Sequence, residues 1–280
     1  MRIAQALIHN IPAVVASTDA QSGWLRLAGY SDLSAALVMD QPELNRVVSR
    51  GLPVPEGSIT FCAPVIASTK LIAIGRNYAD HIRETGATPP PEPLMFAKLS
   101  SSVIDPGAWI EWDTTLTQAV DYEAELAVVI GRTMRRVPAE AALDYVFGYT
   151  CVNDVTARDL QNGDGQWTRA KGLDTFCPLG PWIVTRESIP DPQVLTVRCQ
   201  VNGDMRQNGT TADMIFNVRQ ILAHASRAFT LHPGDVILTG TPDGVGDART
   251  PKALLNDGDV VTIEVEGIGR LENRCRTLKN

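Results

Sequence analysis

Two glutamates lie two residues apart in a short apolar stretch of this 280-residue chain. Glu123 and Glu125 belong to the segment DYEAELAVVIGR, whose apolar and β-branched residues, closed by Gly131, predict a β-strand. Alternate side chains of a strand share a face, so both carboxylates point the same way, roughly 7 Å apart along the backbone. Apolar residues fill the rest of both faces, which indicates that the two glutamates are enclosed.

Enclosed carboxylates need a cation between them, because desolvation and mutual repulsion both oppose their ionisation. A hard divalent ion would supply it, and an all-oxygen ligand set favours Mg²⁺, Mn²⁺ or Ca²⁺ over zinc. Asp154, which follows the apolar run 145–152, is the candidate third carboxylate. The alternative is an edge strand with two solvated glutamates, and Asp154 as the N-cap of a helix that begins near Val155. These residues alone leave both interpretations open.

A second pair of chemically useful side chains lies on a short predicted helix over YADHIRET, with Asn77 as its cap and Gly86 as its end. His81 and Glu84 are three residues apart and therefore share a face. A glutamate that orients a histidine is the arrangement of a general base. The proline-rich GATPPPEP that follows makes the helix resemble a mobile lid. This stretch on its own favours the alternative, a solvated surface helix with an incidental contact.

Two lysines lie in apolar surroundings. Lys98 ends the strand-like segment LMFAK, and its ammonium is expected to turn outward to solvent rather than to meet an internal anion. Lys171 lies beside a segment predicted to be buried, where it would suit a carboxylate or a developing oxyanion; a solvated loop lysine is the alternative. A helix predicted over TARDLQ places Arg158 and Gln161 on the same side as Asp154.

The remaining segments provide the framework for these residues. Residues 1–64 contain short predicted strands at 3–8, 13–16 and 24–27 and a helix at 31–39, which indicates a small β-rich domain ahead of a larger one over 65–280. An amphipathic helix is predicted over 213–229, and strand hairpins from 195 onward, with a turn at 202–204, and from 259 onward. The turn TGTPDGVG offers N–H groups and hydroxyls to an anion, but it lacks the spacing of a Walker or dinucleotide loop.

Composition excludes several classes of function. With 44% hydrophobic residues the chain can bury a large core. A net charge of −7 and a pI near 5.1 argue against a nucleic-acid or anionic-membrane partner. No apolar run is long enough to span a bilayer, and polar residues and a proline interrupt the N-terminal apolar stretch, so no signal peptide is expected. Five scattered cysteines favour reduced, mostly buried thiols in a cytoplasmic protein.

Taken together and in order, six segments closely resemble the fumarylacetoacetate hydrolase family from about Leu71 to the end: GRNYADHIRE, FAK, DYEAELAVVIGR, GYTCVNDVTARDLQ, WTRAKGLDTFCPLGPW and LTGTPDGVG. The leading domain resembles that of bacterial members that are hydroxyheptadienedioate isomerases or keto-acid hydrolases. The resemblance implies a mixed, β-rich α/β fold, a homodimer, and one Mg²⁺ or Mn²⁺ per subunit, with Ca²⁺ as a substitute. One departure is Leu99, which stands where the family usually has proline after the lysine of the FAK block.

The resemblance also implies roles for individual residues. The metal ligands would be Glu123, Glu125 and Asp154. The water-activating dyad, carried on a lid, would be His81 and Glu84, and Lys171 would face the oxygens of the substrate. Further substrate-binding positions would be Arg76, Tyr78, Lys98, Gln161 and Thr241.

The expected activity is cleavage of a C–C bond in an acylpyruvate-like or other diketo acid, through an enolate that the metal stabilises. The alternative within the family is a decarboxylase or isomerase of oxaloacetate-like or 2-hydroxyhepta-2,4-diene-1,7-dioate-like acids, since the fold does not choose between these reactions. Two readings of another class are a calcium-stabilised binding module without turnover and nucleotide binding at TGTPDGVG.

Overall fold

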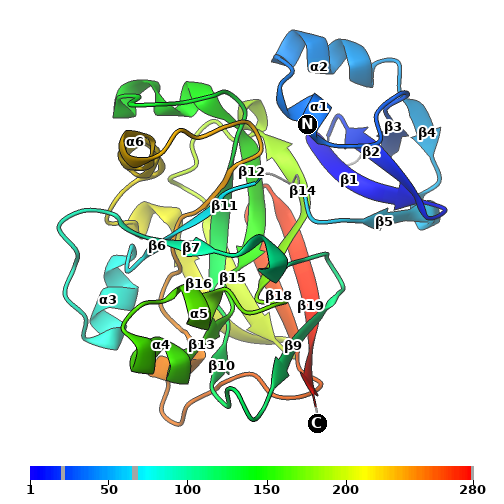
Figure 1. Ribbon diagram of the computed structural model, residues 1–280. Coiled ribbons are helices and arrows are strands. Elements are labelled where there is room, and N and C mark those ends of the chain that lie inside the picture. The colour runs from blue at the N-terminus through cyan, green and yellow to red at the C-terminus, as the bar shows by residue number, and fades with distance from the viewer. Residues whose placement is uncertain (20–22, 65–68, 279–280) are drawn as a thin grey trace.

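The main sheet begins in the N-terminal part of the chain (Figure 1). The computed structural model describes residues 1–19, 23–64 and 69–278. The N-terminal strands are β1 (Arg2–Ile8), β2 (Ile11–Ser17), β3 (Trp24–Arg26), β4 (Leu52–Val54) and β5 (Ile59–Phe61). Two helices, α1 (Ser34–Leu37) and α2 (Gln41–Val48), share one buried apolar cluster with β1 and β2.

The same sheet continues through the rest of the chain. Its further strands are β6 (Leu71–Gly75), β7 (Leu94–Lys98), β8 (Val103–Ile104), β11 (Ala124–Ile130), β12 (Val146–Asn153), β14 (Cys177–Thr185) and β17 (Val236–Leu238). Their order is β4-β3-β2-β1-β14-β12-β11-β17-β6-β7, with β5 paired to β1 and β8 paired to β14. Most pairs are antiparallel, while β17–β6 and β14–β8 are parallel, so the sheet is mixed.

A second sheet packs against the first one (Figure 1). Its strands are β9 (Trp109–Asp113), β15 (Thr196–Val201), β16 (Asp204–Thr210), β18 (Val260–Val265) and β19 (Gly269–Leu278), in the order β16-β15-β18-β19-β9. The apolar cluster between the sheets includes Leu126 and Val128 of β11 and Ile263 of β18. The opposite face of β11, with Ala127 and Val129, belongs to the cluster under the N-terminal helices. Both faces of β11 are therefore covered, as predicted.

Helices and short turns surround these sheets. The longer ones in this part of the chain are α3 (Ala79–Thr85), α4 (Arg158–Asp164), α5 (Thr168–Lys171) and α6 (Val218–Ala228), and a two-stranded ladder pairs β10 (Val120–Asp121) with β13 (Thr156–Ala157). The 3-10 segments are η1 (Glu56–Ser58), η2 (Ser100–Ser102), η3 (Ala139–Tyr145), η4 (Arg186–Ser188), η5 (Thr211–Asp213) and η6 (Gly246–Ala248). The mixed, β-rich α/β architecture expected from the sequence is confirmed.

Several predicted boundaries are wrong for local reasons. The helix predicted over 213–229 begins only at Val218, because the Asn217 side chain accepts from the Gln220 N–H and closes a capping box. The helix predicted over 31–39 is the four-residue α1, and α2 was not predicted. The two hairpins at 195–210 and after 259 are present.

The division of the chain at residues 64 and 65 stays a prediction, because residues 65–68 lie outside the described residues. β1 pairs with β14 through Arg2↔Val184 and Ile3↔Ile183, so the N-terminal strands extend the central sheet. Four of the five cysteines are buried and Cys62 is half-buried, in agreement with the prediction. Among the described residues, no helix combines the length and apolarity needed to cross a bilayer. The cytoplasmic location and the expected lack of nucleic-acid and membrane partners stay predictions.

Candidate active site

Strand register brings the predicted site residues together at the ends of neighbouring strands of the central sheet. β11 starts at Ala124, which pairs with Asn153 at the end of antiparallel β12, so Glu123 and Asp154 lie side by side just beyond the two strands. The Asp154 N–H donates to the Glu123 carbonyl at 2.9 Å. β17 also runs antiparallel to β11, and its last residue, Leu238, leads into the Thr/Gly-rich turn beside Glu125. β6 is parallel to β17, so Arg76, which follows the last residue of β6, lies at the same end of the strands. The edge-strand alternative is wrong, because β11 has a neighbour on each side.

The three predicted metal ligands form a single buried cluster. One carboxylate oxygen from each of Glu123, Glu125 and Asp154 lies within 4.8 Å of the others, and all three side chains are buried. Asp154 caps no helix, since α4 begins at Arg158. The structure therefore favours the convergent interpretation over the solvated one, and the role of these residues as ligands stays a prediction.

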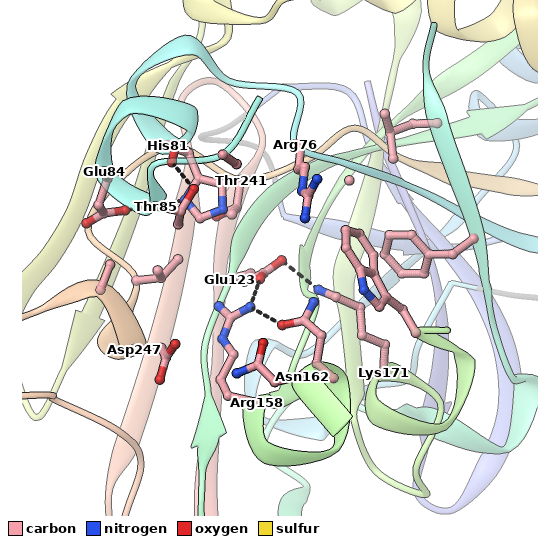
Figure 2. A pocket seen from close by; sticks show the side chains of 18 of the residues that line it. Arg76, His81, Glu84, Thr85, Glu123, Arg158, Asn162, Lys171, Thr241 and Asp247 are labelled. Atoms are coloured by element: carbon pink, nitrogen blue, oxygen red, sulfur yellow. Dashed lines mark hydrogen bonds and ion pairs between the residues drawn. The ribbon is translucent and has the colours of Figure 1, made fainter. Parts of the chain in front are cut away.

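Three cationic side chains surround the cluster. Lys171 donates to Glu123 Oε2 and to Asp154 Oδ2, both at 2.8 Å, and Lys98 donates to Asp154 Oδ1 at 2.5 Å. Arg158 pairs with Glu123 Oε1 at 2.8 Å (Figure 2). It also pairs with Asp121 Oδ2 at 2.9 Å. The expectation that Lys98 turns outward is wrong, because the buried carboxylate of Asp154 attracts its ammonium inward. Lys171 belongs to α5 rather than to a solvated loop.

The pKa values of the two glutamates diverge because their partners differ. Burial by itself would raise the pKa of Glu123, but Lys171 and Arg158 outweigh burial and lower it to about 2. Burial, Asp154 and Glu123 together raise the pKa of Glu125 well above its usual range. Within the described residues Glu125 has no ion pair, and its Oε2 accepts from the Gly240 N–H at 2.7 Å. Glu125 is the carboxylate that lacks a cation.

These residues fit a hard divalent ion. If all four buried carboxylates, the three candidate ligands and Asp121, were ionised, they would exceed the three cations that face them among the described residues by one negative charge. A divalent ion held by the three ligands would turn that excess into one positive charge and allow Glu125 to ionise. The oxygen-only donor set suits Mg²⁺ or Mn²⁺, with Ca²⁺ as a weaker geometric match.

A cavity of about 650 Å³ opens beside the cluster, a volume typical of small-molecule sites. The predicted dyad lies on its wall: His81 Nδ1 is 3.3 Å from Glu84 Oε2 on helix α3, which ends at Gly86 in a left-handed conformation. Glu84 Oε1 accepts from the Gly244 N–H at 2.9 Å, so the predicted lid rests on the Thr/Gly-rich turn. Asn77 does not cap α3; its amide instead donates to the carbonyls of Thr239 and Phe216.

The structure separates the other predicted substrate-binding residues into two groups. Arg76, Gln161 and Thr241 line the cavity. Tyr78 and Lys98 do not: Tyr78 is fully buried and its hydroxyl has no hydrogen-bond partner among the described residues, and Lys98 is buried and paired with Asp154. The sequence reasoning did not assign Asp121 or Trp167 to the site. Four N–H groups hold the Asp121 carboxylate, those of Tyr122, Gly246 and Asp247 and the Arg158 Nε, and only the tertiary structure reveals them.

The Thr/Gly-rich turn uses its donors within the protein. Two of its N–H groups bind Glu125 and Glu84, and the Thr241 hydroxyl donates to the Ala124 carbonyl at 2.9 Å. These contacts of the turn hold side chains of the candidate site in place.

Comparison with known proteins agrees with the geometry. The family model for the fumarylacetoacetate (FAA) hydrolase C-terminal domain matches residues 70–276. Oxaloacetate tautomerase FAHD2B, mitochondrial, of Bos taurus is 42% identical over 238 residues, which cover 82% of this chain and 74% of that protein. Fumarylacetoacetate hydrolase from psychrophilic Exiguobacterium antarcticum has a TM-score of 0.88 at 36% identity, over 99% of this chain and 100% of that chain.

A third relative carries a metal. Maleylpyruvate hydrolase from Sphingobium sp. SYK-6, solved in complex with manganese(II) ion and pyruvate, has a TM-score of 0.82 at 28% identity over 100% of both chains. The match of the family model to most of the chain, together with these relatives, shows that this protein is an enzyme of the fumarylacetoacetate hydrolase family.

Proposed function

We propose that the protein is an Mg²⁺- or Mn²⁺-dependent enzyme that interconverts the keto and enol forms of an oxaloacetate-like 2-oxo acid. The observation that carries the proposal is the buried cluster of Glu123, Glu125 and Asp154, flanked by Lys171 at the cavity wall. The similarity of the chain to oxaloacetate tautomerases supports this reaction more than the C–C hydrolysis expected from the sequence.

The metal would be held by Glu123, Glu125 and Asp154, and when bound it supplies Lewis-acid polarisation of the 2-oxo group. Lys171 has three N–H donors and uses two on Glu123 and Asp154, which leaves one for an oxygen in the cavity. That donor would stabilise the negative charge that develops on the substrate oxygen as the carbon loses its proton.

His81 would move the proton. A carboxylate only accepts hydrogen bonds, so Glu84 fixes the proton of His81 on Nδ1 and leaves Nε2 as the free base. Nε2 would take the proton from the carbon next to the 2-oxo group and return it to oxygen, which completes the tautomerisation. Arg158, which pairs with Asp121 and Glu123, would hold the candidate metal ligand Glu123 in place.

Hydrolysis of a C–C bond in an acylpyruvate-like acid is the second candidate. The observation that favours it is the same dyad, because a base that removes a carbon-bound proton can also activate water. Similarity to the maleylpyruvate hydrolase from Sphingobium sp. SYK-6 supports this second candidate.

The experiment follows proton exchange and products separately. Purified protein is incubated with oxaloacetate in D₂O with Mg²⁺ or Mn²⁺, and NMR measures deuterium exchange at C3, enol decay and any pyruvate released. We expect metal-dependent exchange that EDTA abolishes and that Lys171→Met and His81→Asn remove, with Arg83→Met, on the exposed face of α3, as the control. The proposal fails if oxaloacetate shows no acceleration while an acylpyruvate is cleaved.

The homodimer also remains a proposal. Light scattering coupled to size-exclusion chromatography would test it, and a mass equal to one chain of 30.3 kDa at micromolar concentration would contradict it.

A further inference from the structure

Arg76 stands apart from the other cations of the cavity wall. The remaining cationic side chains there each have a carboxylate partner: His81 has Glu84, Lys171 has Glu123 and Asp154, and Arg158 has Glu123 and Asp121. Within residues 1–19, 23–64 and 69–278, no hydrogen bond or ion pair involves the Arg76 guanidinium. A cation without a protein anion, facing a ligand cavity, is a candidate for binding an anionic group of the ligand.

The position of Arg76 is built by its neighbours. The Cζ of Arg76 lies 5.6 Å from the ring centre of Trp167, within cation–π range. Trp167 in turn packs edge-on against Phe96, with 5.4 Å between the two ring centres. A Cβ at Gly75 would overlap the Trp167 ring, so the glycine lets that ring lie against the end of β6. The guanidinium therefore rests on an aromatic surface whose own packing is fixed.

The backbone at Arg76 is equally constrained. Its φ of 54° lies in the left-handed region that non-glycine residues rarely adopt. The next residue, Asn77, is buried and holds this turn: its amide donates to the Thr239 carbonyl at 2.8 Å and accepts from the Phe216 N–H at 2.9 Å. Figure 2 shows the result, with Arg76 pointing into the cavity toward Glu123 and Lys171.

Charge balance indicates which group of the ligand Arg76 would bind. With a divalent ion in place, the buried cluster carries one net positive charge, which balances one carboxylate of a 2-oxo acid. A second carboxylate needs a cation of its own. The two other acidic side chains of the cavity wall have partners of their own and do not neutralise Arg76. Glu84 contacts His81 and accepts from the Gly244 N–H, and Asp247 pairs with Lys252.

We propose that Arg76 binds the distal carboxylate of the substrate and thereby selects 2-oxo dicarboxylic acids over 2-oxo monocarboxylic acids. The guanidinium offers two parallel N–H donors that match a carboxylate, and its stacking on Trp167 orients them before the ligand arrives. This inference rests on the proposed function, since it assigns the substrate class of the same site.

The experiment compares two acids of equal length in binding rather than turnover. 2-Oxoglutarate and 2-oxopentanoate differ only in the distal carboxylate, and calorimetric titration of the Mn²⁺-loaded protein measures the dissociation constant of each. We expect Arg76→Met to weaken 2-oxoglutarate binding roughly 10- to 100-fold and to leave 2-oxopentanoate binding unchanged. Arg76→Lys, which keeps the charge but loses the paired donors, should lie between wild type and Arg76→Met.

Arg83→Met is the matched control, because Arg83 is an exposed arginine of α3 that pairs with Asp80 and does not line the cavity. The inference is overturned if Arg76→Met weakens both acids equally or neither. The proposed function fails separately, when wild-type protein gives no metal-dependent exchange at C3 of oxaloacetate. Because the Arg76 side chain is exposed, we expect unfolding curves of the Arg76 variants to match those of the wild type.

Discussion

Replacing Glu123 or Glu125 by glutamine should have unequal consequences for the stability of the metal-free protein, although both residues are buried in one cluster. Glu123 forms ion pairs with Lys171 and Arg158, each at 2.8 Å. Glu125 has none within the described residues and accepts a hydrogen bond from the Gly240 N–H. The substitution Glu123→Gln removes a paired charge, whereas Glu125→Gln replaces a carboxyl whose ionisation is opposed by burial and by the like charges of Asp154 and Glu123.

The magnitude for Glu123 follows from its pKa. A pKa lowered from 4.5 to about 2 corresponds to roughly 3 kcal/mol of stability at neutral pH. The sign is that of a depressed carboxyl: this stability is present above pH 4.5 and is lost as the pH falls toward about 2. It agrees with the lower end of the ~3–5 kcal/mol lost when one partner of a buried pair is removed. Glutamine at 125 keeps the Gly240 hydrogen bond, so we expect a change of less than about 1 kcal/mol.

The assay is urea unfolding of EDTA-treated protein at neutral pH, repeated with excess Mg²⁺ or Mn²⁺. Metal at 100 times its dissociation constant should add about 2.7 kcal/mol to the wild type and nothing to either variant. Glu264→Gln is the control, because Glu264 forms a half-exposed pair with Arg198, worth about 0–1 kcal/mol. Equal losses for the two cluster variants without metal, or a larger loss for Glu125→Gln, would refute the reasoning.

Three further predictions concern stability and the cavity wall. Because the pKa of Glu125 is raised above 4.5, the unfolding free energy of the metal-free protein should fall as the pH rises from that value, more in wild type than in Glu125→Gln; parallel pH profiles would contradict this. Gly75→Ala should displace the Trp167 ring and cost about 1–3 kcal/mol, visible as altered tryptophan fluorescence; an unchanged spectrum would contradict the overlap. Asn217→Ala should cost about 1 kcal/mol in urea unfolding, since it removes the capping box with Gln220, and no loss would mean that the cap is not needed.

Local periodicity was sufficient to predict the pairs that lie close in the sequence. Two residues of spacing in a strand place Glu123 and Glu125 on one face, and three residues of spacing in a helix place Glu84 against His81. The order of six motifs was sufficient to identify the family. Each of these features depends on a few neighbouring residues, so each can be predicted from the sequence without knowledge of the tertiary structure.

The tertiary structure decided how charge is distributed around the site. Lys98 and Asp154 are 56 residues apart, and Glu84 and Gly244 are 160 residues apart, so no local pattern relates them. Apolarity around Lys98 predicted an outward ammonium, and the prediction failed because it took no account of a distant carboxylate. Among the residues that the structure describes, Arg76 has no carboxylate partner, and its own segment cannot predict this, because it depends on where the acidic side chains of the cavity wall find their partners.

The sequence by itself therefore determined which side chains share a face and which family the chain belongs to, because side-chain direction repeats with the period of the backbone. The structure alone decided which glutamate is paired, which lysine turns inward and which arginine of the cavity wall has no carboxylate partner among the described residues. The physical reason is that a buried charge is stable only beside an opposite one, and strand register, set by the whole sheet, decides which charges meet.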